Sequence, residues 1–503
     1  MAKQRNDVLY SRLNANPYDG FLRVTYPPNY QGTTFSMSGN KLFAQTDNSF
    51  YIPTFALSNG ILTASVEVDD DSSSRFIQYL KAVRKPFKKL SKLEFLNPDN
   101  SVAFSLDSNR ERKFSGAHDS RAFIQSGNLN VSLQNGKRRN ASVQLSNLDN
   151  AYDYAVNKLW YGKRIRLSMG LVLPDGTEYY LPQGVFYLEN PKSTFSTNQK
   201  TVNYNLVDKW AYLDGSLFGK LDTTYQVEQT DVFSAMQAVL NQSIYTYGVP
   251  RNKMDQIDNV TPVFTAFYNG RTYLVKTSDG TYIQKNMTDV PYTITASNTF
   301  SELLLELNTI IAGLIGYDQT GALRVEPSQD SVSDSDKPIL WYFTPENSQL
   351  LSVSESVNTS SIYNDVLIIG EGMSGYEVYG RATNYDPASD LNVNLIGRRI
   401  YKENKAEYWN ADQCVDLAEY YLKQMTVQSK SITIQCPQMF HLMENRLISV
   451  KRTDKPGSPV ERHLIQSFSI PIGETGAMSI NATSVCDKPL MITTSSRIVE
   501  SAS

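Results

Sequence analysis

The sequence predicts a mainly β protein of the α+β class. Two strand-rich blocks, 120–212 and 340–485, carry runs in which apolar and polar residues alternate, and this is typical of strands with one buried face. Tyr accounts for 31 of the 503 residues, and Tyr favours strands and interfaces. Because a single open sheet of many strands exposes its edges, closure of a block into a barrel or sandwich is favoured.

Composition excludes several classes of protein. With 41% hydrophobic and 20% charged residues the chain is expected to fold, and a net charge of -3 argues against a dedicated nucleic-acid or anionic-membrane binder. The three Cys are odd in number and lack metal-ligand spacing, and the three His are far from one another, so neither a disulfide scaffold nor a metal site is predicted; we expect no cofactor and no catalytic group. The most apolar stretch, 303–317, is too short and too polar to span a bilayer.

The N-terminal region, 1–115, is β-rich and of unclear role. The run Asp69-Asp70-Asp71 followed by three Ser residues predicts a loop, and 92–96 with 102–106 predicts a hairpin around a turn at 97–100. Between them lies an acid-free basic run with a possible apolar stripe beneath it. The simpler interpretation of its cations is a solvated face, and the alternative is a surface that docks an acidic partner. The cations are Arg75, Lys81, Arg84, Lys85, Lys88, Lys89 and Lys92.

The first strand block, 116–220, opens with a hairpin whose register the pattern predicts. A three-residue loop at 134–136 pairs Val131 with Arg139 and Leu129 with Ala141, which keeps the apolar residues on one face, and it gives Gly136 the left-handed position. Strands at 165–173, 178–181, 185–189 and 202–207 follow, and we expect an antiparallel meander of about six strands.

An α+β module, 221–335, is expected next. Thr230 is a candidate cap for a helix whose apolar stripe runs from Val232 to Leu240, and Thr299 with Glu302 predicts a capping box for a second helix that Gly313 ends. A hairpin around 318–321 and a Ser/Asp-rich linker at 327–338 complete this module.

The second block, 336–486, combines strands with one helix. Strands are predicted at 365–369, 431–436, 446–451, 462–470 and 477–484, and the helix runs from Ala411 to Met425 with Asn410 as its cap. The polar C-terminal tail, 487–503, is expected to be mobile unless a neighbour docks it.

These segments resemble, in their order along the chain, the tail hub or baseplate hub proteins of long-tailed bacteriophages. The resemblance covers about 120–485. It rests on the following stretches: 127–133, 135–149, 160–167, 182–189, 204–210, 300–325, 363–370, 382–387, 397–399, 411–425, 462–471 and 478–480. One departure is the run from Met443 to Ile448, where the family often has a Gly-Asp turn.

The resemblance implies two tube-like antiparallel β-barrel domains per chain, with small α+β modules between them. It implies a structural virion protein of the tail, assembled in the host bacterial cytoplasm: a homotrimeric hub that joins a six-fold tail tube to a three-fold tip. The implied partners are the tail tube or distal tail protein, a tip or spike protein and the tape-measure protein, and DNA passes through the channel during genome ejection without specific binding.

Two other classes of function remain open from the residues alone. Tyr and Trp pairs such as Tyr179-Tyr180 and Tyr408-Trp409 are compatible with a receptor- or carbohydrate-binding tail protein, although packing or a subunit interface explains them as well. A cell-wall hydrolase borne on the tail is the third reading, and the absence of a recognisable catalytic motif weakens it.

Overall fold

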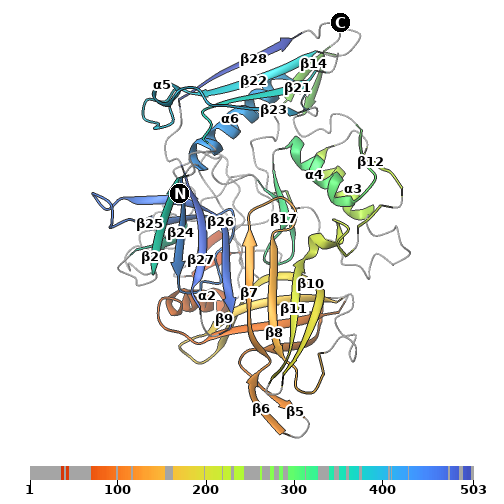
Figure 1. The fold of residues 1–503 in the computed structure, drawn as a ribbon, viewed down its shortest axis with the longest axis vertical. Coiled ribbons are helices and arrows are strands. Elements are labelled where there is room, and N and C mark those ends of the chain that lie inside the picture. Colours follow the sequence, from red (N-terminus) through yellow and green to blue (C-terminus); the bar gives the residue numbers. More distant parts are fainter. Residues whose placement is uncertain are drawn as a thin grey trace.

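The computed structural model describes part of the chain: residues 35–38, 41–44, 70–97, 100–114, 117–152, 163–196, 199–217, 219–221, 223–227, 231–242, 261–262, 272–276, 282–286, 293–311, 313–326, 339–344, 350–357, 362–372, 376–405, 408, 410–428, 430–473, 476–485 and 491–499. Alternating residues at 61–68 predict a strand, but this segment, the cap Thr230 and the linker 327–338 lie outside these residues. The mainly β fold is confirmed, with large antiparallel sheets and few helices (Figure 1).

One thirteen-stranded sheet carries both strand blocks. The first block contains β7 (Ile124–Ser132), β8 (Arg139–Ser146), β9 (Arg164–Val172), β10 (Glu178–Ser196) and β11 (Gln199–Asp208). The second contains β20 (Ser352–Val357), β24 (Lys430–Cys436), β25 (Leu447–Lys451), β26 (Val460–Ile472) and β27 (Met478–Ser484). The sheet also includes β3 (Lys89–Leu96), β4 (Val102–Asp107) and β19 (Ile339–Phe343).

The two blocks repeat one topology. Across the sheet, the strands of the first block lie in the order β7-β8-β11-β10-β9, and those of the second in the order β20-β24-β27-β26-β25. If the five strands of each block are numbered along the chain, both blocks have the spatial order 1-2-5-4-3. The C-terminal half of β26 pairs antiparallel with β7, so the blocks join edge to edge, and Leu129 stands opposite Ile470. The duplicated strand block that the family resemblance implies is present.

Short-range pairings agree with the sequence prediction. Leu129 faces Ala141 and Val131 faces Arg139 across β7 and β8, and Gly136 has φ 88° in the connecting loop. The alternation that predicted this register places Leu129, Val131, Ala141 and Val143 in the core. The hairpin β3–β4 is confirmed as well, with Asn100 at φ 67° in its turn.

The predicted meander is wrong in two respects. β8 pairs with β11 rather than with β9, because the later three strands fold back across the sheet. The two strands expected at 178–181 and 185–189 are one strand, β10, bent by a bulge at Gln183. A bulge adds one residue and kinks a strand without ending it, so the Pro182–Gly184 segment is a bend and not a boundary.

The predicted loop at the start of the basic run is also wrong from Asp70 onward. Helix α2 spans Asp70–Ala82. Asp and Ser break helix interiors but favour the first turn, where they can cap free N–H groups and meet the positive end of the helix dipole. The predicted apolar stripe is confirmed: Leu80 and Val83 are buried, and Phe76 and Phe87 pack partly buried against the same core.

The middle module has its own core, formed by α3 (Val232–Gln242), α4 (Phe300–Ile310), β17 (Leu314–Tyr317) and β18 (Leu323–Glu326). Both helices and the hairpin are confirmed, but their caps differ from prediction. Asp231 Oδ2 accepts from the N–H groups of Phe233 (3.1 Å) and Ser234 (3.0 Å). Thr299 occupies the cap position of α4 without a capping hydrogen bond, because the Ser301 N–H is taken by the Leu213 carbonyl at 2.9 Å.

A separate sheet, β23-β21-β22-β28, lies at the far end of the molecule with α6 (Ala411–Gln428) packed on it (Figure 1). It consists of β21 (Asp365–Glu371), β22 (Glu377–Asn384), β23 (Ile400–Lys405) and β28 (Ile492–Val499). Asn410 caps α6 as predicted, accepting from the Asp412 N–H at 2.7 Å. The polar tail is not free along this stretch, because β28 pairs with β22.

The remaining elements are short. They are β1 (Phe35–Ser38), β2 (Lys41–Ala44), β5 (Glu111–Phe114), β6 (Ala117–Ala122), η2 (Lys209–Tyr212), β12 (Tyr225–Val227), β13 (Thr261–Pro262), β14 (Thr272–Lys276), β15 (Tyr282–Asn286), β16 (Ile294–Ala296) and α5 (Val393–Ile396). No helix among the described residues combines the length and the apolar character that a membrane span requires.

Candidate functional site

Over part of six neighbouring strands, one face of the large sheet is polar and carries no ionisable side chain; Arg462, near the start of β26, lies on the same side of the sheet beyond this part. We call this part the neutral face. Because strand residues alternate between the two faces, each apolar residue of the core has polar neighbours on this side. The neutral face consists of Ser352, Ser354, Ser356, Ser431, Thr433, Gln435, Ser479, Asn481, Thr483, Ser467, Ser469, Asn128, Asn130, Ser132, Asn140, Ser142 and Gln144.

Side-chain hydrogen bonds cross every strand boundary of the neutral face. They link Ser356 to Ser431 (2.8 Å), Thr433 to Asn481 (2.8 Å), Asn481 to Ser467 (3.1 Å), Asn128 to Ser469 (2.8 Å) and Asn130 to Asn140 (3.1 Å). These groups satisfy one another, so the surface offers polarity without a charge that could hold an ionic ligand.

The neutral face continues onto β11 and then ends. Asn203 and Asn205 extend it, and on the next strand Lys192 and Glu189 stand opposite them. The chain as a whole is 20% charged, so a surface of this extent without an ionisable group is a distinctive feature of the sheet.

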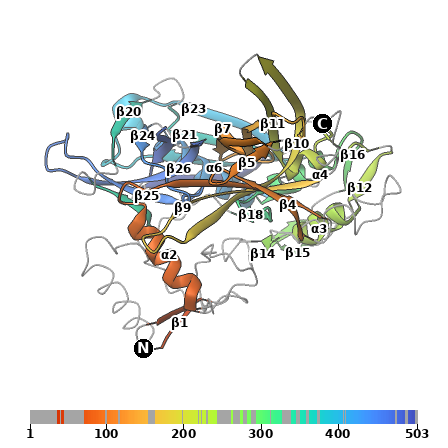
Figure 2. The ribbon, with the colours of Figure 1, turned by 90° about the horizontal axis from the view of Figure 1, so that it is seen from below.

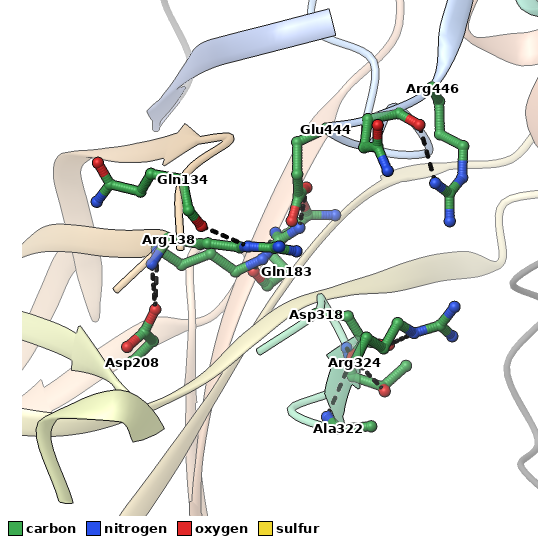
Figure 3. Close-up of polar contacts among 12 residues, drawn as sticks. Gln134, Arg138, Gln183, Asp208, Asp318, Ala322, Arg324, Glu444 and Arg446 are labelled. Carbon is green, nitrogen blue, oxygen red and sulfur yellow. Dashed lines mark hydrogen bonds and ion pairs between the residues drawn. The ribbon is translucent and has the colours of Figure 1, made fainter. Parts of the chain in front are cut away.

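A second feature, a buried ionic joint, holds the two strand blocks and the middle module together (Figure 3). Arg139 of the first block pairs with Glu444 of the second, and both side chains are almost fully buried. Arg446 donates to Glu326 of the middle module through both terminal nitrogens, at 3.2 and 3.1 Å. Since burying charges is costly unless they are paired, the joint fixes how the three units meet.

The bulge in β10 adds a further link to this joint. Gln183 donates from Nε2 to the Phe440 carbonyl at 2.7 Å, and its own carbonyl accepts from Arg139 at 3.1 Å. Asp208 Oδ2 accepts the N–H groups of Arg138 (2.7 Å) and Arg139 (2.9 Å). Burial raises the pKa of Asp208 to about 6, although these hydrogen bonds oppose the rise.

Within the hairpin of the middle module, Arg324 pairs with Asp318. Burial acts to raise the pKa of Asp318, but Arg324 and the hydrogen bonds from Thr320 and Ala322 outweigh it, so the pKa lies below its ordinary value. The Lys209 ammonium donates to the Gly321 carbonyl at 2.9 Å and so ties the end of the first block to the same hairpin.

The cations of the predicted docking surface lie in different surroundings. Arg75, Lys81, Lys85 and Lys88 are exposed on or just after α2. Arg84 turns inward, with its guanidinium 5.2 Å from the centre of the Trp341 ring. Lys92 lies over the ring of Tyr180 at 4.7 Å and pairs with Glu94, and Lys89 is half-buried on β3. Docking by these residues stays a prediction.

The two histidines with described side chains lie in the core. His441 is hydrogen-bonded to the Tyr79 hydroxyl at 3.0 Å, and burial lowers the pKa of His441 to about 3. Burial likewise lowers the pKa of His463 to about 4. Tyr179 packs on Tyr79, with ring centres 5.6 Å apart, and Tyr408 is buried, which fits the packing interpretation of these aromatics. Among the described residues, no group of three or more His, Cys, Asp or Glu is placed to hold a metal ion.

No protein-family model matches the sequence, and no curated protein matches it. Solved structures of phage tail proteins do match it. The chain is similar to the tail protein from Neisseria meningitidis MC58, with 9% identity, a TM-score of 0.50, and coverage of 80% of this chain and 97% of that one. The expected tail-protein fold is therefore confirmed.

Two other solved structures match with lower scores. They are the 43 kDa tail protein of prophage MuSo2 from Shewanella oneidensis (12% identity, TM-score 0.47, 79% of this chain and 98% of that chain) and prophage tail protein gp18 from Listeria monocytogenes EGD-e (10% identity, TM-score 0.42, 79% and 94%).

The sequence prediction missed both the neutral face and the buried joint. The polar residues at alternate positions of each strand were visible, but strand order decides whether they form one surface. The joint has no local signal, because Arg139 and Glu444 are 305 residues apart.

Proposed function

We propose that this protein is a structural, non-catalytic component of a phage tail, and that three copies form a hub ring between the six-fold tail tube and the three-fold tip. The observation that carries this proposal is the repeated strand block. Each chain supplies two copies of one topology joined edge to edge through β26 and β7, so it occupies two neighbouring positions of a ring. Three chains then supply six positions, and ring closure leaves no sheet edge open.

The neutral face supports a channel as part of this function. We propose that it lines the lumen through which the tape-measure protein and then DNA pass. Phosphate binding by proteins rests mainly on Lys and Arg, and no residue of the neutral face is either of these. Most of its residues hydrogen-bond to one another through their side chains, which leaves fewer polar groups free to retain a passing chain.

The mass of the assembled protein tests the hub. We expect light scattering to give three copies of the 56.6 kDa chain, alone or with purified tail-tube protein. A monomer that ignores the tube protein would contradict the hub. A six-copy ring would contradict it as well, because twelve strand blocks do not match a six-fold tube.

We further propose that the exposed cations of α2 and the segment after it dock an acidic neighbour in the tail. Arg75, Lys81, Lys85 and Lys88 carry the charge outward, while the inward residues of this segment anchor it to the sheet. Replacing Lys81 and Lys85 with Glu should weaken assembly with partner tail proteins and leave the fold unchanged. Unchanged assembly would rule out this docking role.

A further inference from the structure

The two strand blocks can be aligned residue by residue through their registers. In the first block, Lys192 stands opposite Asn203 just after a bulge in β10. In the second, Ser467 stands opposite Asn481 just after a bulge in β26. Lys192 is therefore equivalent to Ser467, and three residues further on Phe195 is equivalent to Ile470.

The same alignment extends to the first strand of each block. Asn203 pairs with Gln144, which pairs with Ser126 on β7. Asn481 pairs with Thr433, which pairs with Ser354 on β20. Ser126 is therefore equivalent to Ser354, and three residues further on Leu129 is equivalent to Val357.

This alignment singles out two open edges. Within the chain, β26 pairs with β25 as far as Leu464 and then, from Ser467 onward, with β7 along the same edge. The equivalent edge of β10 pairs with β9 as far as Phe186, and no pairing on that edge is described beyond it. β20, the equivalent of β7, pairs with β24 alone among the described strands. Figure 2 shows the outer ends of β10 and β11 projecting as a hairpin from the rest of the sheet.

Apolar side chains at these two edges are exposed where their equivalents are buried. Leu129 and Ile470, which face each other at the internal junction, are both 0% exposed. Phe195 and Val357, their equivalents, are 78% and 50% exposed. Both strands thus expose apolar residues at the positions that form the junction within the chain.

We propose that the occupant of each edge is a second copy of this chain, and that β20 of one copy pairs antiparallel with the outer part of β10 of the next, with Val357 opposite Phe195. This inference rests on the proposed trimer and specifies its interface. Each ring then has six equivalent junctions, three within chains and three between chains. Burial of an exposed aromatic and a β-branched residue against each other supplies the apolar contact that antiparallel cross-strand pairs favour.

Disulfide trapping tests the register. Residues directly opposite in an antiparallel pair have Cα atoms about 4.5 to 5.5 Å apart, within the range that a disulfide spans. In a Cys486→Ser background, the full chain carrying Phe195→Cys and Val357→Cys should form a covalently closed trimer on oxidation, seen on a non-reducing gel. The matched control, Phe195→Cys with Val460→Cys, pairs two residues that are 78% and 59% exposed but not opposed, and should show only background cross-linking.

A charge substitution gives a second readout. Phe195→Asp should shift the assembly to monomers with unchanged circular dichroism, while Ile498→Asp, at a residue 66% exposed on β28, should leave the trimer intact. A closed trimer by mass that neither cross-links through 195 and 357 nor responds to Phe195→Asp would overturn the interface and leave the hub standing. A protein that stays monomeric in the unsubstituted form would overturn both.

Discussion

Introducing lysines into the neutral face should turn a non-binding surface into one that holds DNA. The positions are Asn203 and Asn481, which the registers make equivalent in the two blocks. One lysine at each position in three copies gives six cations in a ring. For duplex DNA the logarithm of affinity falls with the logarithm of salt concentration by about 0.9 per neutralised phosphate. Six contacts therefore predict a slope of about -5, or roughly a thousand-fold loss between 50 and 200 mM salt.

The measurement is fluorescence anisotropy of a short linear duplex mixed with the purified assembly over a salt series. The matched control places two lysines on β28, as Thr494→Lys and Ser496→Lys, at exposed residues in the separate sheet. The unsubstituted protein should bind weakly, and the control should add far less affinity than the neutral-face variant. Equal affinity and slope for the two variants would refute the assignment of this face to the lumen, as would an unchanged affinity in the Asn203→Lys, Asn481→Lys protein.

Three further predictions concern the fold. Glu444→Gln should lower stability by about 3 kcal/mol because it leaves the buried Arg139 uncompensated, and Glu444→Gln with Arg139→Met should recover most of it; urea midpoints within error of the parent protein would contradict this. His441 has its pKa lowered to about 3, so its contribution to stability is complete above pH 6.5 and is lost as the pH falls toward 3, at up to about 1.4 kcal/mol per pH unit. Melting temperatures from pH 4 to 7 should show that slope reduced in His441→Gln, and identical slopes would argue against the assignment. Asp231→Ala should lower the free energy of unfolding of the middle module by about 1 kcal/mol, measured by hydrogen exchange. Thr299→Ala removes no capping bond and should lower it by a few tenths of a kcal/mol at most.

Local patterns predicted the hairpins β3–β4 and β7–β8 and the helices α3, α4 and α6, but not α2. The alternation in β7 and β8 fixed the pairing of Leu129 with Ala141, because a shift of one residue would turn every apolar side chain to the solvent. The apolar stripe that runs from Phe300 to Ile311 in the sequence predicted α4 for the same kind of reason. In each case one buried face and one short connection determine the structure, and both are visible within a few residues.

Long-range pairing could not be predicted in the same way. β8 and β11 are both amphipathic, and nothing in either strand says that they pair with each other rather than with β9. The bulge at Gln183 could not be predicted locally either, since the side chain of Gln183 donates to the carbonyl of Phe440, 257 residues away. The candidate functional surface depends on strand order, so it could be assembled only once the pairings were known.

The junction between β26 and β7 can form only after a delay during synthesis of the chain. Asn128 and Ser469, which are hydrogen-bonded across it, are 341 residues apart, so the first block is complete except for this edge long before its partner strand is made. At the usual 5–20 residues per second, the ribosome needs about 20 to 70 s to make the chain between them. During that interval β7 presents an unpaired edge, to which the outer part of β10 of a finished neighbour, the equivalent of β26, could add instead. We therefore expect fewer mispaired assemblies when translation initiates slowly and the nascent chains are far apart.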